Sequence, residues 1–319
     1  MEYPRGGKMA PNSLVTAIGT YGHTKALKDG TVKSGRIGLE FEEVSPIIAA
    51  FRRMVRGIEF DVSEMAISTY LCAKSFNKPF TAIPIFPVRA FHHGAIMYNT
   101  KSGIKGPKDV EGRKVGVNRG YTVTTGLWAR GILQSEYGVD LNKVTWVLSG
   151  DEHVEEWKAP ANVVSPEGAD LAKMLVDGEI DAAIGVGPVD SPDVKPLISD
   201  ARNAGFESFK KTGVFPINHT MVIRDSLLES DPWIAEELFA AFKSSKRVYL
   251  DKLDAGKDLE EADQAMVQTK SVVGDPVPYG IAANLKTLEA ALQFNYDQKI
   301  TPTRFSVEDV FASNTLNLS

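Results

Sequence analysis

The chain alternates between short apolar runs and longer segments in which apolar residues recur every three or four positions. A short apolar run indicates a buried strand, and the longer spacing indicates an amphipathic helix. Strands are therefore expected at 14–19, 38–44, 80–86, 94–99 and 114–117. Helices are expected at 45–57, 122–137, 169–177, 231–253 and 281–298. Strands that alternate with helices predict an α/β architecture, with parallel sheets covered on both faces.

Composition and charge narrow the class of protein. The chain has 319 residues, which is long enough for two domains, and its 43% hydrophobic and 24% charged residues are typical of a globular protein. The net charge is −5 and there is no block of Lys and Arg, so nucleic acid is not expected as a partner. No apolar run reaches the length of a membrane span, so no membrane partner is expected either. A homo-oligomer is left open.

The N-terminal segment and the single cysteine bear on location. The segment "MEYPRGGKMAPNS" lacks the apolar stretch of a secretory signal, so residues 1–12 are expected to form a disordered tail. A lone Cys72 excludes an internal disulfide and fits a reducing compartment. Together these features predict a cytoplasmic protein.

Two stretches in the middle of the chain carry a resemblance at the level of the fold. "GIKGPKDVEGRKVGV" and "MLVDGEIDAAI" resemble parts of type 2 periplasmic solute-binding proteins. The resemblance implies two α/β lobes with two crossovers and a ligand cleft between the lobes. Lobe 1 is expected to be discontinuous, with residues 13–97 and 220–319, and lobe 2 is expected to contain residues 98–219.

Five further stretches resemble the 4,5-dihydroxyphthalate decarboxylase family. They are "GTYGHT" (19–24), "FDVSEMAISTYL" (60–71), "AIPIFPVRAFHHGAIMYN" (82–99), "TGVFPINHTMVI" (212–223) and "PYGIAANLKTLEA" (278–290). The resemblance implies a cytoplasmic enzyme that removes one carboxylate from a dihydroxylated phthalate. In the first stretch Thr20 and Gly22 stand where the family is expected to carry acids, which leaves the exact substrate open.

The favoured function is cofactor-free decarboxylation of a small hydroxylated aromatic acid. A ring hydroxyl pushes electrons toward the carbon that bears the carboxylate, an acid protonates that carbon, and CO₂ leaves. The alternative is a solute-binding protein without chemistry, either the receptor of a transporter or a cytoplasmic sensor. A receptor returns its ligand unchanged, whereas an enzyme consumes it.

The stretch "PVRAFHHGAIMYN" supplies the first candidates for the site. In an extended segment Arg89, Phe91 and His93 share one face, and His92 lies on the other. Arg89 would then bind a carboxylate, Phe91 would stack on the ring, and His93 would move a proton. The alternative is that Arg89 pairs with a structural carboxylate and that both histidines hydrogen-bond to the backbone.

Further candidates come from the other family stretches. His219 follows an apolar turn at the second crossover and competes with His93 for the role of general acid. The resemblance implies that Tyr21, His23 and Thr24 belong to the ligand site. Tyr21 and His23 are expected to contact the ring hydroxyls.

Two predicted helix starts offer backbone amides to an anion. Such amides form a ready anion site, and two helix starts facing one cleft would suit a substrate with two carboxylates. The alternative for each hydroxyl is simple helix capping. The candidates are Ser63, Glu64 and Ser68 at the first helix start, and Thr122, Thr124 and Thr125 at the second.

A metal site is not expected. His23, His93 and His219 lack the spacing of known metal-binding motifs. His153 lies in the polar stretch "SGDEHVEEWK" and is expected to be solvated.

Overall fold

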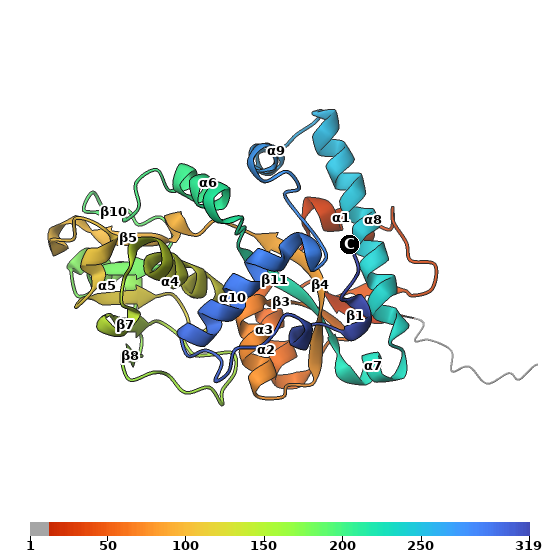
Figure 1. Cartoon of the computed structure of the whole chain (residues 1–319), viewed down its shortest axis with the longest axis horizontal. Helices are drawn as coiled ribbons and strands as arrows, with labels where there is room; N and C mark the ends of the chain where they lie inside the picture. Colours follow the sequence, from red (N-terminus) through yellow and green to blue (C-terminus); the bar gives the residue numbers. More distant parts are fainter. Residues whose placement is uncertain (1–12) are drawn as a thin grey trace, which may run out of the picture.

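The computed structural model describes residues 13–319 and contains two β-sheets, one in each of two lobes (Figure 1). The strand order is β2-β1-β3-β11-β4 in lobe 1 and β10-β5-β9-β6-β7-β8 in lobe 2. The strands of lobe 1 are β1 (Leu14–Ala17), β2 (Leu39–Phe41), β3 (Val62–Ala66), β4 (Phe80–Arg89) and β11 (Ile217–Arg224). The strands of lobe 2 are β5 (Ile96–Asn99), β6 (Lys114–Val117), β7 (Thr145–Leu148), β8 (Val163–Val164), β9 (Ala182–Ile184) and β10 (Val194–Pro196). The tail predicted at 1–12 lies outside the described residues.

The chain passes between the two sheets twice. Residues 90–95 connect β4 of lobe 1 to β5 of lobe 2, and residues 213–216 lead back to β11 of lobe 1. β5 already pairs in lobe 2 from Ile96, and β11 already pairs in lobe 1 from Ile217. The chain therefore passes from one sheet to the other a few residues before each lobe boundary expected from the sequence.

Both sheets are mixed, which differs from the predicted parallel sheets. In lobe 1 β1, β2 and β3 run parallel, whereas β11 runs antiparallel to both β3 and β4. In lobe 2 β6, β7, β8 and β9 run parallel, whereas β5 is antiparallel to β9 and β10. The reason is topological, because β5 and β11 enter their sheets from the opposite lobe.

All five helices predicted from periodicity are present, with ends displaced by a few residues. Figure 1 shows the long helix α8 along the outer side of lobe 1 and α10 across the junction of the lobes. Within residues 13–319 no helix has both the length and the apolarity that a membrane crossing requires. The helices are α1 (Gly22–Lys28), α2 (Ile48–Gly57), α3 (Ile67–Ser75), α4 (Thr124–Tyr137), α5 (Leu171–Asp177), α6 (Ala201–Thr212), α7 (Asp225–Ser230), α8 (Trp233–Ala255), α9 (Glu261–Val273) and α10 (Leu285–Asp297).

Helix α4 of lobe 2 is joined to lobe 1 by close packing and buried hydrogen bonds. Trp128 donates its indole N–H to the carbonyl of Ile217 at 2.8 Å. The buried guanidinium of Arg130 donates to Gln298 Oε1 at 2.8 Å, just after α10. Gly131 has no side chain where the ring of Phe294 crosses the helix, and this permits α4 and α10 to approach closely.

Ion pairs bridge the lobes at the surface, between α2 and the segment that follows β7. Arg52 lies 2.6 Å from Asp151, and Arg56 lies 2.9 Å from Glu155. The two carboxylates are largely exposed and the two guanidinium groups are partly exposed. An exposed ion pair contributes only about 0–1 kcal/mol, so the bridge holds the lobes together weakly.

The contact between α4 and α10 leads to a first prediction. Gly131→Ala would place a Cβ 2.4 Å from the ring of Phe294, which is itself packed edge-on against Trp128. Overpacking costs about 1–3 kcal/mol, which exceeds the gain of about 1 kcal/mol from better helix propensity. Urea unfolding should show a lower free energy of unfolding for the variant.

The control for this prediction is the same change in a Phe294→Ala background. There the added methyl group has room, so Gly131→Ala should raise the free energy of unfolding relative to Phe294→Ala alone. Equal effects of Gly131→Ala in both backgrounds would contradict the packing argument.

Candidate active site

A small cavity of about 80 Å³ lies between the lobes. Lobe 1 contributes the end of β3, the start of β11 and part of α2, while lobe 2 contributes the segments after β6 and β9 and the start of α4. Ligands of open α/β sheets bind outside the carboxyl ends of the strands, and β3, β6 and β9 all end here. The polar side chains of the lining come from Thr69, Asn118, Arg119, Thr124, Thr125, His153, Asn218 and His219.

His219 is the histidine on the lobe 1 wall of this cavity. It lies near the start of β11, opposite Ala66 at the end of β3. Its Nδ1 is 2.5 Å from Glu64 Oε1, and its ring packs edge-on against Phe51 at 4.9 Å between centroids. Because Nδ1 is engaged by Glu64, the second nitrogen, Nε2, is the one left for a ligand. The sequence analysis expected His219 at the cleft, and its side chain lines this cavity, while its role as the acid stays a prediction.

Glu64 is a fully buried carboxylate beneath His219. Besides the bond to His219, it accepts a hydrogen bond from Tyr21 Oη at 2.7 Å and one from the backbone N–H of Gly19 at 2.9 Å. Burial alone would raise the pKa of Glu64, but the donors from His219, Gly19 and Tyr21 together hold that pKa below its ordinary value. Glu64 is therefore charged where it lies, next to the imidazole.

The other side chains of the first family stretch form a layer behind His219. Thr24 Oγ1 accepts from the backbone N–H of Tyr21 at 2.8 Å and shapes the turn before α1. His23 is buried and stacked on Tyr21 at 5.6 Å, and burial lowers its pKa to about 4. Tyr21, His23 and Thr24 are thus placed around Glu64 and do not line the cavity.

The start of α4 and Arg119 make up the opposite wall. Arg119 has a left-handed backbone with φ of 70°, uncommon for a residue with a side chain, and its N–H donates to Ser149 Oγ at 2.8 Å. Within residues 13–319 its guanidinium makes no hydrogen bond or ion pair. Thr124 and Thr125 begin α4 beside it, where the first amides of the helix have no partner within the helix. A cation and a helix N-terminus facing one cavity make an anion site.

Arg89 does not lie in this cavity, contrary to the expectation from strand alternation. The strand ends at Arg89, and its guanidinium is buried inside lobe 1, where it donates to the carbonyl of Phe215 at 2.7 Å and to Asn284 Oδ1. Burial lowers the pKa of Arg89 to about 9. Phe91 packs on Phe215 at 5.0 Å outside the cavity.

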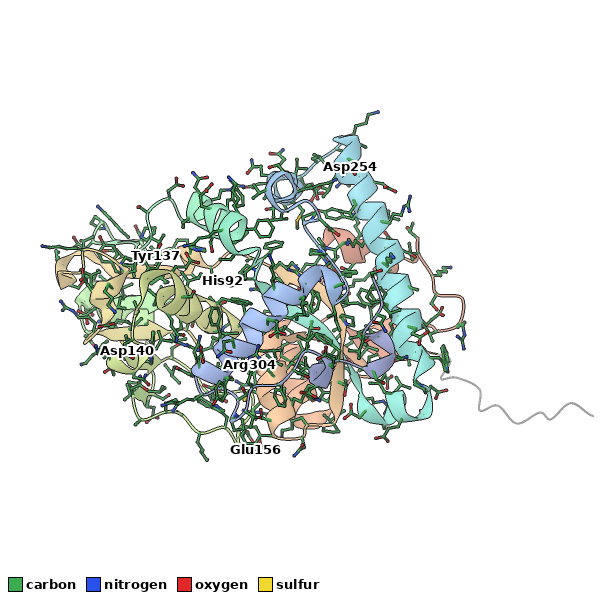
Figure 2. The ribbon with its side chains drawn as sticks, in the orientation of Figure 1. His92, Tyr137, Asp140, Glu156, Asp254 and Arg304 are labelled. Carbon is green, nitrogen blue, oxygen red and sulfur yellow. The ribbon has the colours of Figure 1, made fainter. Side chains whose placement is uncertain are left out.

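The two adjacent histidines belong to the first crossover. A short 3-10 helix (His93–Ala95) interrupts the extended chain, so His93 does not share a face with Arg89. His93 Nε2 is 3.1 Å from Glu136 Oε2 on α4, whereas His92 Nε2 is 3.1 Å from Asn218 Oδ1 at the start of β11. Figure 2 shows His92 at the junction between the lobes. Both histidines thus connect elements at the hinge, through side chains rather than through the backbone.

Most hydroxyls predicted at the helix starts are engaged inside the protein. Ser63 donates to the carbonyl of Glu64 at 2.8 Å, Ser68 to Asn295 at 3.2 Å, and Thr122 to Glu152 at 2.5 Å. Their side chains are buried and do not line the cavity. Of the predicted hydroxyl contacts, Thr124 and Thr125 alone reach the lining.

Five polar residues of the lining were not predicted as site residues from the sequence, and His153 and Arg119 are the two that can carry a charge. His153, expected to be solvated, is buried beside Phe51 at the cavity, and burial lowers its pKa to about 4. Arg119 follows β6 by two residues in "GVNRG", and its place just past a buried strand is the signal that could have identified it. Thr69, Asn118 and Asn218 complete the missed polar lining.

The two positions that lack the acids expected from the resemblance lie away from the cavity. Thr20 is exposed and its hydroxyl accepts from Lys28 Nζ at 2.7 Å. A Cβ at Gly22 would lie 2.1 Å from the ring of Tyr249, so this chain has no room for a larger residue there. The absence of acids at residues 20 and 22 therefore takes no side chain away from the cavity lining.

Among the described residues no group of three His, Cys, Asp or Glu side chains is arranged to hold a metal ion.

Comparison with solved structures identifies the fold. The chain aligns over 96% of its length with the periplasmic aliphatic sulphonate binding protein SsuA from Escherichia coli, at 12% identity, 99% coverage of that chain and a TM-score of 0.56. It aligns equally well with the desulfurization enzyme DSZB, at 15% identity, 96% coverage of this chain, 98% of the other and a TM-score of 0.56. The predicted type 2 periplasmic-binding-protein fold is therefore confirmed.

Comparison with curated proteins gives closer relatives, although no family model matches the chain. It is 33% identical over 182 residues to 4,5-dihydroxyphthalate decarboxylase of Pseudomonas putida, covering 54% of this chain and 70% of that protein. It is 31% identical to 4,5-dihydroxyphthalate decarboxylase of Comamonas testosteroni, covering 95% of this chain and 97% of that protein. The chain therefore belongs to the 4,5-dihydroxyphthalate decarboxylase family.

Proposed function

We propose that the protein decarboxylates a hydroxylated aromatic acid of the phthalate type, with His219 as the general acid. The observation that carries the proposal is the cavity itself, which sets a histidine on a buried carboxylate opposite an arginine and a helix N-terminus. Full-length similarity to a decarboxylase of dihydroxyphthalate supports the reaction class.

The reaction needs an acid at one carbon and an anion site for the rest of the substrate. A hydroxyl ortho or para to the leaving carboxylate supplies electron density to the carbon that bears it. The proton on His219 Nε2 forms a new C–H bond at that carbon, and the C–C bond to the carboxylate then breaks. Its electron pair restores the aromatic ring, CO₂ departs, and solvent returns a proton to the imidazole.

Arg119 takes the binding role that the sequence analysis gave to Arg89. A guanidinium donates two parallel hydrogen bonds to a carboxylate, and the first amides of α4 beside Thr124 and Thr125 suit a second one. We assign the retained carboxylate to Arg119 and the start of α4. This leaves the departing carboxylate toward His219 on the other wall.

Substrate entry requires the lobes to separate. A cavity of about 80 Å³ is small beside the 300–1,000 Å³ that is typical, to order of magnitude, of ligand pockets. The exposed ion pairs of Arg52 and Arg56 across the rim contribute little, so breaking them costs little. We therefore expect an open form to admit the substrate and the form described here to surround it.

The reaction class is tested by product analysis. Incubation with 4,5-dihydroxyphthalate and its positional isomers in D₂O should yield a dihydroxybenzoate with one deuterium at the carbon that lost CO₂. Mass spectrometry and proton NMR measure the loss and the position of the label. Recovery of every compound unchanged, together with ligand-induced stabilisation, would instead favour a binding protein.

The acid is identified by comparing two histidines. His219→Asn should lower kcat by roughly 10²–10⁴, the usual contribution of general acid catalysis. His93→Asn serves as the matched control, because His93 lies at the hinge against Glu136 and outside the cavity lining. Steady-state kinetics that show the larger kcat loss in His93→Asn would reverse the assignment.

The carboxylate site is tested with a charge-preserving change. Arg119→Lys keeps the charge but loses the two-pronged geometry. A charge-assisted hydrogen bond contributes about 1.5–3 kcal/mol, so the Kd for phthalate should rise roughly 10- to 150-fold. Isothermal titration calorimetry measures this directly.

Arg304→Lys is the control for Arg119→Lys, because Arg304 pairs with Glu289 and does not line the cavity. Its Kd for phthalate should equal that of the unaltered protein. An unchanged Kd for Arg119→Lys as well would place the carboxylate elsewhere.

A further inference from the structure

A series of hydrogen bonds leads from His219 at the cavity into the interior of lobe 1. Glu64 contacts His219 Nδ1 at 2.5 Å and accepts from Tyr21 Oη at 2.7 Å through the same oxygen, Oε1. Its other oxygen, Oε2, accepts from Gly19 N–H. The imidazole and the phenol therefore share one buried oxygen, and a change at either one alters the charge that the other meets.

We propose that Tyr21 and Glu64 act as positioning residues that set how readily His219 holds its proton, with effects of opposite sign. This inference rests on the proposed role of His219 as the acid. The Glu64 carboxylate favours the imidazolium form, and the Tyr21 hydroxyl weakens that effect because it donates to the same oxygen.

The opposite signs follow from the charges. An opposite charge at this distance raises the pKa of a neighbouring base, and removing the charge with Glu64→Gln takes that support away. Tyr21→Phe removes a donor from the carboxylate, so more of its negative charge acts on His219. The first change should lower the pKa of His219 and the second should raise it.

The other charged and titratable groups around His219 keep their charge state and so do not produce opposite shifts in its pKa. His92 from the first crossover and His153 from the segment after β7 are held neutral by burial, with pKa values of about 4. Arg119 faces His219 across the cavity and stays cationic throughout. His23 adjoins Glu64 from α1 and is also neutral, because burial lowers its pKa to about 4. His93 contacts Glu136 on α4 rather than Glu64, so neither substitution changes its partner.

The direct experiment is an NMR titration of the histidine imidazoles in the full chain without substrate, with His219→Asn to assign the resonance. The pKa of His219 should fall by about one to three pH units in Glu64→Gln, as loss of a neighbouring opposite charge predicts. In Tyr21→Phe the pKa of His219 should rise. The inference is overturned if the pKa of His219 changes in the same direction in both variants, or if it changes in neither.

Tyr279→Phe is the matched control. Tyr279 is also a buried tyrosine of lobe 1, but its hydroxyl has no hydrogen-bond partner within residues 13–319. This variant should leave the pKa of His219 in place, and a rise equal to that of Tyr21→Phe would show that the shared oxygen is not the cause. If Glu64→Gln does not fold, the comparison of Tyr21→Phe with Tyr279→Phe decides the question alone.

Activity gives a second and separate readout. An acid must be protonated to act, so kcat/KM should decrease as pH rises through the pKa of His219 in the free enzyme. That decrease should move to lower pH in Glu64→Gln and to higher pH in Tyr21→Phe. Absence of decarboxylation in the unaltered protein would defeat the proposed function, whereas the NMR result would still decide the coupling of Tyr21, Glu64 and His219.

Discussion

A negative charge buried inside lobe 1 must be surrounded by donors, and this requirement at Glu64 organises the site. An isolated carboxylate in the protein interior is very costly unless hydrogen bonds compensate it. Its three donors come from two places in the chain: Gly19 and Tyr21 in the turn before α1, and His219 on strand β11. The hydrogen bonds to this one carboxylate therefore fix the positions of the turn before α1, strand β3 and strand β11 relative to one another. The imidazole of His219 is oriented as a consequence.

The secondary structure could be predicted because its signal is local. The helices at 231–253 and 281–298 carry their periodicity in the sequence itself, and both are present as α8 and α10. The mixed sheets were missed because strand direction depends on which lobe a strand enters from, and local patterning carries no such information. The family stretches supplied what periodicity could not, namely the two lobes and the region of the cleft.

The candidate site was harder to predict than the fold. Arg89 and His93 would share a face only if the chain were extended between them, and a single turn of 3-10 helix removes that shared face. His153 has polar neighbours in the sequence, and its burial comes from tertiary contacts such as the one with Phe51. His219 was placed at the cleft from its family stretch, while its partner Glu64 was assigned to the ligand because nothing in the sequence joins residues 64 and 219.

The position of β11 has a consequence for the order in which the protein can form during synthesis. This strand lies between β3 and β4 in the lobe 1 sheet, yet it is made after the whole of lobe 2. Until residues 217–224 leave the ribosome, β3 and β4 have no strand to join them, and Glu64 lacks His219. Lobe 2 is continuous in sequence and meets no such delay. The nascent chain must therefore hold an unfinished N-terminal half-sheet while its second lobe folds, and the edges of β3 and β4 that β11 later joins stay unpaired during that time.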